Sequence, residues 1–131
     1  MNRPEQLMQE LLALFPDFSQ TWASESYSWT DEKGRFTSCG VFAPFSHYVA
    51  DDLRGSRRLD LEKVFKFAEQ LMSDQDEEVS TAVATCFLEN LMNRTPNELD
   101  PHAFVPLLGP GSRDYCRAWD EFCGTKTEGL W

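Results

Sequence analysis

Residues 76–93 constrain the fold of this chain more than any other segment, because their apolar side chains surround a helix instead of lining one side. Three acids at 76–78 suit the first turn, where the helix dipole favours negative charge, and Ser73 or Asp74 can serve as the N-cap. The apolar residues that follow are Val79, Ala82, Val83, Ala84, Cys86, Phe87, Leu88, Leu91 and Met92. Since a helix that is apolar on every side is buried, the segment predicts a central helix covered by other elements.

Other segments with helical periodicity predict the elements that cover this helix. The clearest is 59–73, where an apolar stripe opposes a charged face. The remaining predicted helices, with their caps and ends, are about 4–15, a helix capped by Asp17, one over 41–53 with Pro44 in its first turn and Gly55 at its end, and one from Ser112 to Gly124. No alternating strand pattern stands out, so we expect an all-α fold of about five or six helices. A chain of 131 residues suits one domain, 1–131.

Two further segments have the composition of loops. Residues 28–40 contain two glycines, several Ser and Thr residues and charges of both signs. A hairpin turning at Lys33-Gly34 is the alternative, because Tyr27 and Trp29 alternate with polar neighbours. The residues after 124 are expected to be loose, with docking of the terminal Trp131 as the alternative.

The four cysteines are expected to be reduced and mostly buried. No C-x-x-C motif occurs, Cys86 lies in the apolar helical pattern, and Cys116 and Cys123 share a predicted apolar helix face with Trp119 and Phe122. The first residues lack the basic and apolar regions of a secretory signal, and no apolar run is long enough to span a membrane. We therefore expect a cytoplasmic protein, a compartment in which disulfides are rare.

The charge balance narrows the classes of partner. With 22 acidic and 12 basic residues the net charge is -10, which disfavours nucleic acid and anionic membranes as partners. Acids concentrate in 1–32, with six acids and one base, and in 67–100, with eight acids and one base, whereas Arg54, Arg57 and Arg58 form a local basic turn. Such acids either keep a small domain soluble or steer a basic protein partner toward it.

Catalytic and metal-binding patterns are missing from the sequence. Neither His47 nor His102 has a carboxylate or cysteine at ligand spacing, and no P-loop, H-E-x-x-H or G-x-S-x-G motif occurs. The spacing Asp74-x-Asp76-x-Glu78 lacks the glycine and the final glutamate of a calcium loop. We therefore expect a protein that is not an enzyme and needs no cofactor.

Two segments combine the residue types that protein partners recognise. Aromatic side chains adjoin acids in the first, and such residues are enriched at interface hot spots, while the second is the acidic start of the central helix. For each residue, core packing or a solvated surface is the other interpretation. The candidate partner-binding residues are Tyr27, Trp29, Asp31, Glu32, Asp74, Asp76, Glu77 and Glu78.

Several strings of the sequence resemble a group of small helical bacterial domains, some of which act as immunity proteins of polymorphic toxin systems. The strings are LLALFPDF at 11–18, LEKVFKFAEQL at 61–71, DEEV at 76–79, AVA at 82–84 and FLENL at 87–91. The pair 59–73 and 76–93 also resembles a HEAT-type helix pair. The resemblance covers about half of the chain, and it implies binding of a cognate toxin domain without a catalytic residue or cofactor. A helical adaptor or regulatory module without a toxin partner is the alternative.

Overall fold

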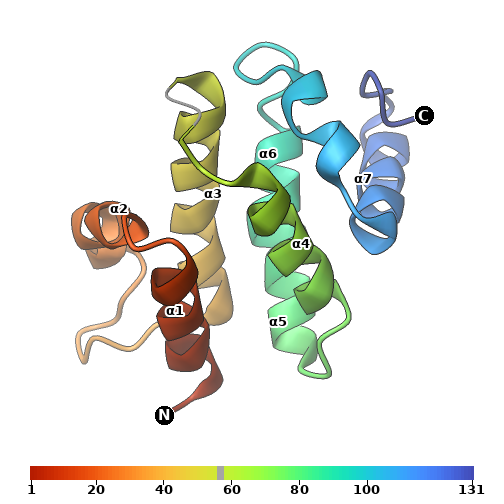
Figure 1. Ribbon diagram of the computed structural model, residues 1–131. Coiled ribbons are helices and arrows are strands. Elements are labelled where there is room, and N and C mark those ends of the chain that lie inside the picture. The colour runs from red at the N-terminus through yellow and green to blue at the C-terminus, as the bar shows by residue number, and fades with distance from the viewer. Residues whose placement is uncertain (56–57) are drawn as a thin grey trace.

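The computed structural model describes residues 1–55 and 58–131, so Arg57 of the predicted basic turn lies outside the described residues. Within these ranges every regular element is a helix, which confirms the all-α fold (Figure 1). The α-helices are α1 (Arg3–Leu14), α2 (Phe18–Glu25), α3 (Ser38–Arg54), α4 (Leu61–Met72), α5 (Glu77–Ala82), α6 (Glu89–Met92) and α7 (Pro110–Cys123). The other helical segments are the 3-10 turns η1 (Ser26–Ser28), η3 (Pro101–Ala103) and η4 (Val105–Leu107) and the π-helical segment η2 (Val83–Leu88).

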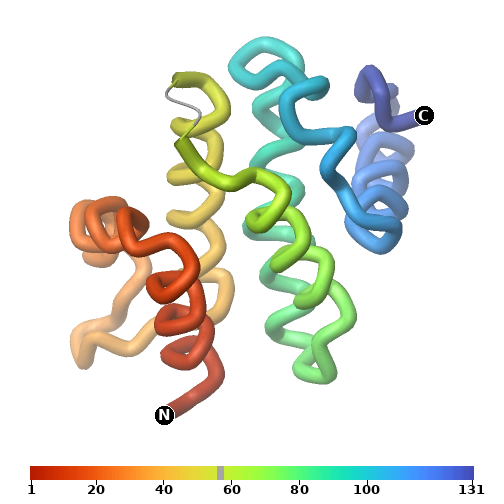
Figure 2. The backbone as a smooth tube through the Cα atoms, viewed as in Figure 1, coloured from red at the N-terminus to blue at the C-terminus, as the bar shows by residue number. Residues whose placement is uncertain are grey.

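The predicted central helix is present. α5, η2 and α6 follow one another without a break and form one helix over 77–92. It contacts α3, α4 and α7 and lies between α3 and α7 in Figure 2. Its fully or nearly fully buried residues are Val79, Ala82, Val83, Ala84, Phe87, Leu88, Leu91 and Met92. The helix is not covered on every side, because Glu77, Glu78, Thr81 and Thr85 recur at helical spacing and are exposed. The helix is therefore central and buried except along this polar stripe.

Phenylalanines connect the two halves of the core. Phe45 of α3 meets Phe18 edge-on at 5.3 Å between ring centroids and stacks on Phe87 of η2 at 5.5 Å. Phe87 also contacts Phe65 of α4 at 5.9 Å. The α1–α3 side and the α4–α7 side are therefore joined in one hydrophobic core around the central helix.

The third helix begins earlier than predicted, so the placement of Pro44 in its first turn is wrong. α3 starts at Ser38, because the Thr37 side chain accepts a hydrogen bond from the Gly40 backbone N–H at 3.0 Å and caps the helix. Pro44 then lies inside the helix, where it lacks an N–H to donate back to the preceding turn. The predicted end at Gly55 is confirmed.

The segment before α3 is a loop, and the hairpin alternative is wrong. Its reversal is a turn around Gly34, which has a φ of +75° that glycine adopts without strain. The Asp31 carboxylate accepts hydrogen bonds from the backbone N–H groups of Lys33 at 2.8 Å and Arg35 at 2.9 Å. These local bonds satisfy the turn without a strand ladder.

The start of α7 is capped by another helix, and the prediction of Ser112 as its cap is wrong. Glu69 on α4 accepts hydrogen bonds from the backbone N–H groups of Gly111 and Ser112, both at 2.8 Å, and from the Ser112 hydroxyl at 2.7 Å. Gly109 gives this carboxylate room, because a Cβ there would lie 2.5 Å from Glu69 Cδ. Asp17 is the N-cap residue of α2, as predicted, although its side chain makes no capping hydrogen bond there.

The C-terminal segment is docked and not loose. Asp120, which is 1% exposed, accepts hydrogen bonds from the Thr127 backbone at 2.6 Å and hydroxyl at 2.8 Å and from Trp131 Nε1 at 3.0 Å. Leu130 is fully buried. Of the two alternatives for the tail, docking is therefore the correct one, but Leu130 is the residue that enters the core, while Trp131 stays 50% exposed and is held by its hydrogen bond to Asp120.

The prediction of four reduced, mostly buried cysteines is wrong for three of them. Cys39 and Cys86, which are 47 positions apart, form a disulfide between α3 and η2. Cys123 is an exposed thiol and its neighbour Phe122 is 82% exposed, so the apolar face of α7 is narrower than predicted. Cys116 alone fits the prediction: burial raises the pKa of its thiol to about 12.

Candidate partner-binding surface

Three helices begin at the same end of the molecule, and most of the candidate residues lie there. The N-terminal ends of α1, α3 and α5 point toward the lower edge of Figure 1, and the loop over 29–37 leads into the start of α3 at the same end. Their caps are Asn2, Thr37 and Asp76, each accepting a backbone N–H with its side chain. Because helix dipoles place positive partial charge at this end, the acids that gather here are locally favourable. We call this region, together with the 29–37 loop and the α4–α5 turn, the acidic end.

Two of the candidate acids organise the α4–α5 turn. Asp74 contacts Arg3 of α1 at 2.8 Å and accepts the Asp76 backbone N–H at 2.9 Å, and these contacts, the backbone hydrogen bond first, lower the pKa of Asp74. Asp76 is the N-cap of α5 and accepts the Glu78 N–H at 2.9 Å. The cap is thus neither Ser73 nor Asp74, as the sequence suggested, but Asp76 itself. Both side chains have a structural role before any partner is considered.

The candidate residues of the first segment differ in their surroundings. Tyr27 is 81% exposed, whereas Trp29 is half-buried and its backbone oxygen lies 3.3 Å from where a Cβ on Gly40 would be. Backbone hydrogen bonds from the turn and contact with Arg35 lower the pKa of Asp31. Glu32 is exposed. This segment therefore offers Tyr27 and Glu32 to solvent, while Trp29 and Asp31 shape the loop.

An open groove of about 470 Å³ runs between the start of α3 and the first turns of α5. Glu77 and Glu78, both exposed, lie on one wall, and Thr37 lies on the other. We call it the acidic groove; the Cys39–Cys86 disulfide lines it. Thr37 also lines a neighbouring hollow with Trp29 and Asp31. The two candidate segments, far apart in sequence, therefore border one continuous surface.

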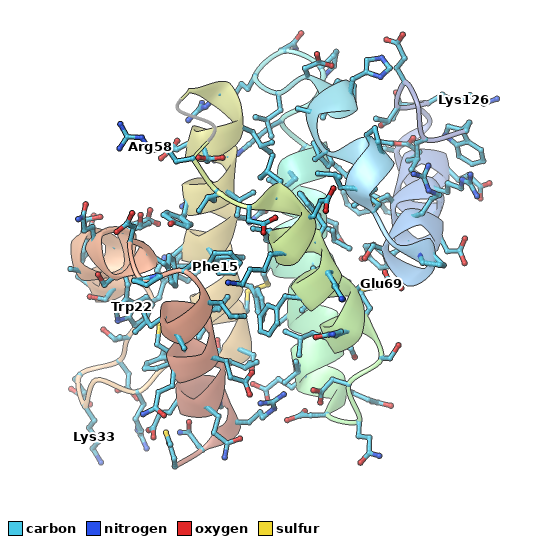
Figure 3. All side chains as sticks on the ribbon, in the orientation of Figure 1. Phe15, Trp22, Lys33, Arg58, Glu69 and Lys126 are labelled. Atoms are coloured by element: carbon cyan, nitrogen blue, oxygen red, sulfur yellow. A yellow bond between two sulfur atoms is a disulfide. The ribbon has the colours of Figure 1, made fainter. Side chains whose placement is uncertain are left out.

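Sequence reasoning missed the residues that join these two segments. The Thr37-Ser38 pair before an apolar run is an N-cap signal that could have placed the start of α3. The Cys39–Cys86 link had no such signal, because residues 47 positions apart pair only when the tertiary fold brings them together. Figure 3 shows the Lys33 side chain projecting from the tip of the loop, away from the core.

Outside the acidic end, a pair of ionisable side chains links two helices. His47 of α3 contacts Glu25 of α2 through Nδ1 at 2.7 Å, half-buried between the two helices. No group of three or more His, Cys, Asp or Glu side chains within residues 1–55 and 58–131 could hold a metal ion. Among the helices described in these ranges, none combines the length and apolar character needed to cross a membrane.

The fold and this surface define a small all-helical domain with an acidic end formed by three helix starts. A family model described as a domain of unknown function (DUF7674) matches residues 8–124, and the chain belongs to that family. Neither a curated protein nor a solved structure matches the chain. α4 and α5 run antiparallel in Figure 1, while the likeness to a HEAT-type pair stays a prediction.

Proposed function

We propose that this protein is an immunity protein that binds a cognate toxin domain and blocks its active site or substrate path. The observation that carries the proposal is the surface on which exposed Glu77 and Glu78 line a groove next to the hollow that Trp29 and Asp31 line. The strings of sequence that resemble immunity proteins give the class of partner. Binding of this kind needs no cofactor.

The acidic end suits a basic toxin domain, such as one that acts on nucleic acid. Asp31 and Asp74 each contact an arginine of this chain, so part of their charge is compensated within the protein. Glu77 and Glu78 are exposed on the groove wall and present their carboxylates to the partner. Charge of this kind accelerates association, and an exposed aromatic side chain such as Tyr27 adds contact area after docking.

A helical adaptor is the second candidate, and one observation favours it. Phe122 on α7 is 82% exposed and stacks on Trp119 at 5.4 Å between ring centroids. The exposed Phe122, supported by the half-buried Trp119, gives the protein a second apolar surface away from the acidic end, which an adaptor uses and a simple inhibitor does not require.

The test is calorimetric titration against the toxin domain encoded by the neighbouring upstream gene, with growth rescue in the same strains. We expect tight 1:1 binding with rescue. The variant Glu77→Lys/Glu78→Lys should reduce the association rate by about tenfold or more at low salt, and the loss should shrink at high salt. No binding and no rescue by the wild-type protein would favour the adaptor.

A matched control changes the same number of charges elsewhere. Asp114 and Glu121 are exposed on α7, so Asp114→Lys/Glu121→Lys gives an equal net charge without touching the acidic groove. We expect this variant to associate at close to the wild-type rate. Equal losses for both variants would show that only net charge matters and would remove the acidic groove from the interface.

A further inference from the structure

The Cys39–Cys86 disulfide lies where the two sides of the acidic groove meet. Cys39 is the second residue of α3, directly after the Thr37 cap, and Cys86 belongs to the π-helical segment that continues α5. Both residues are half-buried and both line the open groove, so the disulfide is placed at the groove and not deep in the core. By contrast, Cys116 is fully buried in the core. The disulfide is thus placed for contact with a dissolved thiol.

We propose that Cys39–Cys86 is a thiol–disulfide exchange site, and that its reduction loosens the acidic end and weakens partner binding. The inference about binding rests on the proposed function, whereas the exchange chemistry and the loosening stand without it. The co-reactant is a low-molecular-weight or protein thiol that reaches the groove.

The exchange balances as a two-electron reduction by two thiols. The thiolate of the first attacks Cys86 Sγ, the Cys39–Cys86 bond breaks, and Cys39 leaves as a thiolate. A second thiolate then attacks the outer sulfur of the mixed disulfide, releasing Cys86 as a thiolate and the oxidised co-reactant as its disulfide. The two protein thiolates take up the two protons that the attacking thiols released.

Residues around the pair favour this direction of attack. The positive N-terminal end of the 17-residue helix α3 stabilises a thiolate at Cys39, which makes Cys39 the better leaving group. The Thr85 hydroxyl lies 3.4 Å from Cys86 Sγ but donates its hydrogen to the Thr81 carbonyl oxygen at 2.8 Å, so the preference for Cys39 as leaving group comes from the helix start. Glu77 and Glu78 repel anionic thiols, so a neutral thiol should react faster than glutathione.

The disulfide also explains how the two sides of the groove are held together. On one side, the Thr37 cap and the packing of Trp29 against Gly40 tie the loop to the start of α3. On the other, Glu77 and Glu78 belong to the helix that carries Cys86. The covalent bond between Cys39 and Cys86 joins these two units at their exposed edge, so breaking it frees their separation to vary.

The first experiment measures reactivity in the native full chain. The protein is exposed to dithiothreitol or to glutathione, alkylated with iodoacetamide and analysed by mass spectrometry, while circular dichroism monitors the fold. We expect Cys39 and Cys86 to become alkylated while the protein is native and Cys116 stays protected. In a parallel reaction we expect the neutral monothiol 2-mercaptoethanol to react faster than the anionic monothiol glutathione at equal thiolate concentration, by about fivefold at low salt and less at high salt. Alkylation of the pair only as the protein unfolds would overturn the proposal.

The second experiment measures loosening without a partner. Hydrogen exchange of the oxidised and reduced protein should show faster exchange after reduction at 29–40 and at 77–82, with little change at the start of α4. Wild type under reductant and Cys39→Ser/Cys86→Ser should agree, and Cys123→Ser is the control that keeps the disulfide. Unchanged hydrogen exchange at the acidic end would overturn the claim that reduction loosens it.

The third experiment adds the toxin domain from the upstream gene. We expect reduction to weaken its binding by about tenfold, because a surface with variable spacing must be ordered on association. Equal affinity for both redox forms would overturn the binding part of the inference while leaving the immunity function in place. Absence of binding by either form would instead reject the immunity function. The alkylation and hydrogen-exchange experiments would still test the reactivity of the disulfide and the loosening of the acidic end.

Discussion

At the scale of single residues, the carboxylate of Glu69 links α4 to the first turn of α7. It accepts hydrogen bonds from the backbone N–H groups of Gly111 and Ser112 and from the Ser112 hydroxyl. N–H groups in the first turn of a helix have no hydrogen-bond partner within that helix. We expect Glu69→Gln to lower the free energy of unfolding at pH 7 by about 1–2 kcal/mol, because an amide keeps one acceptor but loses the charge that strengthens these bonds. Urea denaturation measures this change, and Glu62→Gln, an exposed acid on the same helix, should cost much less.

The same carboxylate gives a pH dependence with a defined sign. Partial burial raises the pKa of Glu69, but the hydrogen bonds from Ser112 and Gly111 outweigh it and hold the pKa below its usual 4.5. A lowered pKa in the folded state stabilises the fold above the pKa of the unfolded chain, and this stabilisation is lost as the pH falls through the folded value. The gap between wild type and Glu69→Gln should therefore shrink below about pH 4.5. A gap that stays constant down to pH 3 would contradict the assigned role.

At the scale of elements, Asp76 separates the structural and recognition roles of the α5 start. Its side chain caps the helix, whereas Glu77 and Glu78 are exposed on the groove wall. We expect Asp76→Ala to lower the free energy of unfolding by about 1 kcal/mol, and Asp76→Asn, which removes the same charge but keeps a capping oxygen, to change it by only a few tenths. Chemical denaturation of both variants checks this. Equal losses would mean that charge, not capping, stabilises the turn.

Helices whose apolar residues recur at helical spacing were predictable from the sequence. α4 and the central helix follow from apolar residues at helical spacing, and Gly124, with a φ of +72°, ends α7 as predicted. The predictions that failed concern residues whose hydrogen-bond partners lie elsewhere in the chain. Glu69 caps α7 from 42 positions away, and Asp120 fixes a tail whose composition indicated a loose end.

The candidate partner-binding surface also has parts that local sequence rules predict and parts that depend on the tertiary fold. The acids at 76–78 were placed at a helix start from sequence alone, because the dipole and capping rules are local. Their proximity to the Trp29 loop depends on how α3 packs on the central helix, which no local rule gives. The disulfide that lines the groove was missed for the same reason.

At the scale of the whole molecule, the disulfide joins the two halves that Phe45 and Phe87 already connect through the core. A cross-link between residues 47 positions apart restricts the unfolded chain far more than the folded one. We expect reduction to lower the free energy of unfolding by about 2–4 kcal/mol while leaving the native helix content unchanged.

Urea denaturation of the protein with and without dithiothreitol measures this loss. The midpoint should fall on reduction, while Cys39→Ser/Cys86→Ser should start at the lower value and not respond to the reductant. Cys123→Ser should behave as wild type, because its thiol is exposed and outside the link. Coincident curves for oxidised and reduced wild type would mean that the core alone sets the stability of the fold, and that the disulfide acts on the acidic end only.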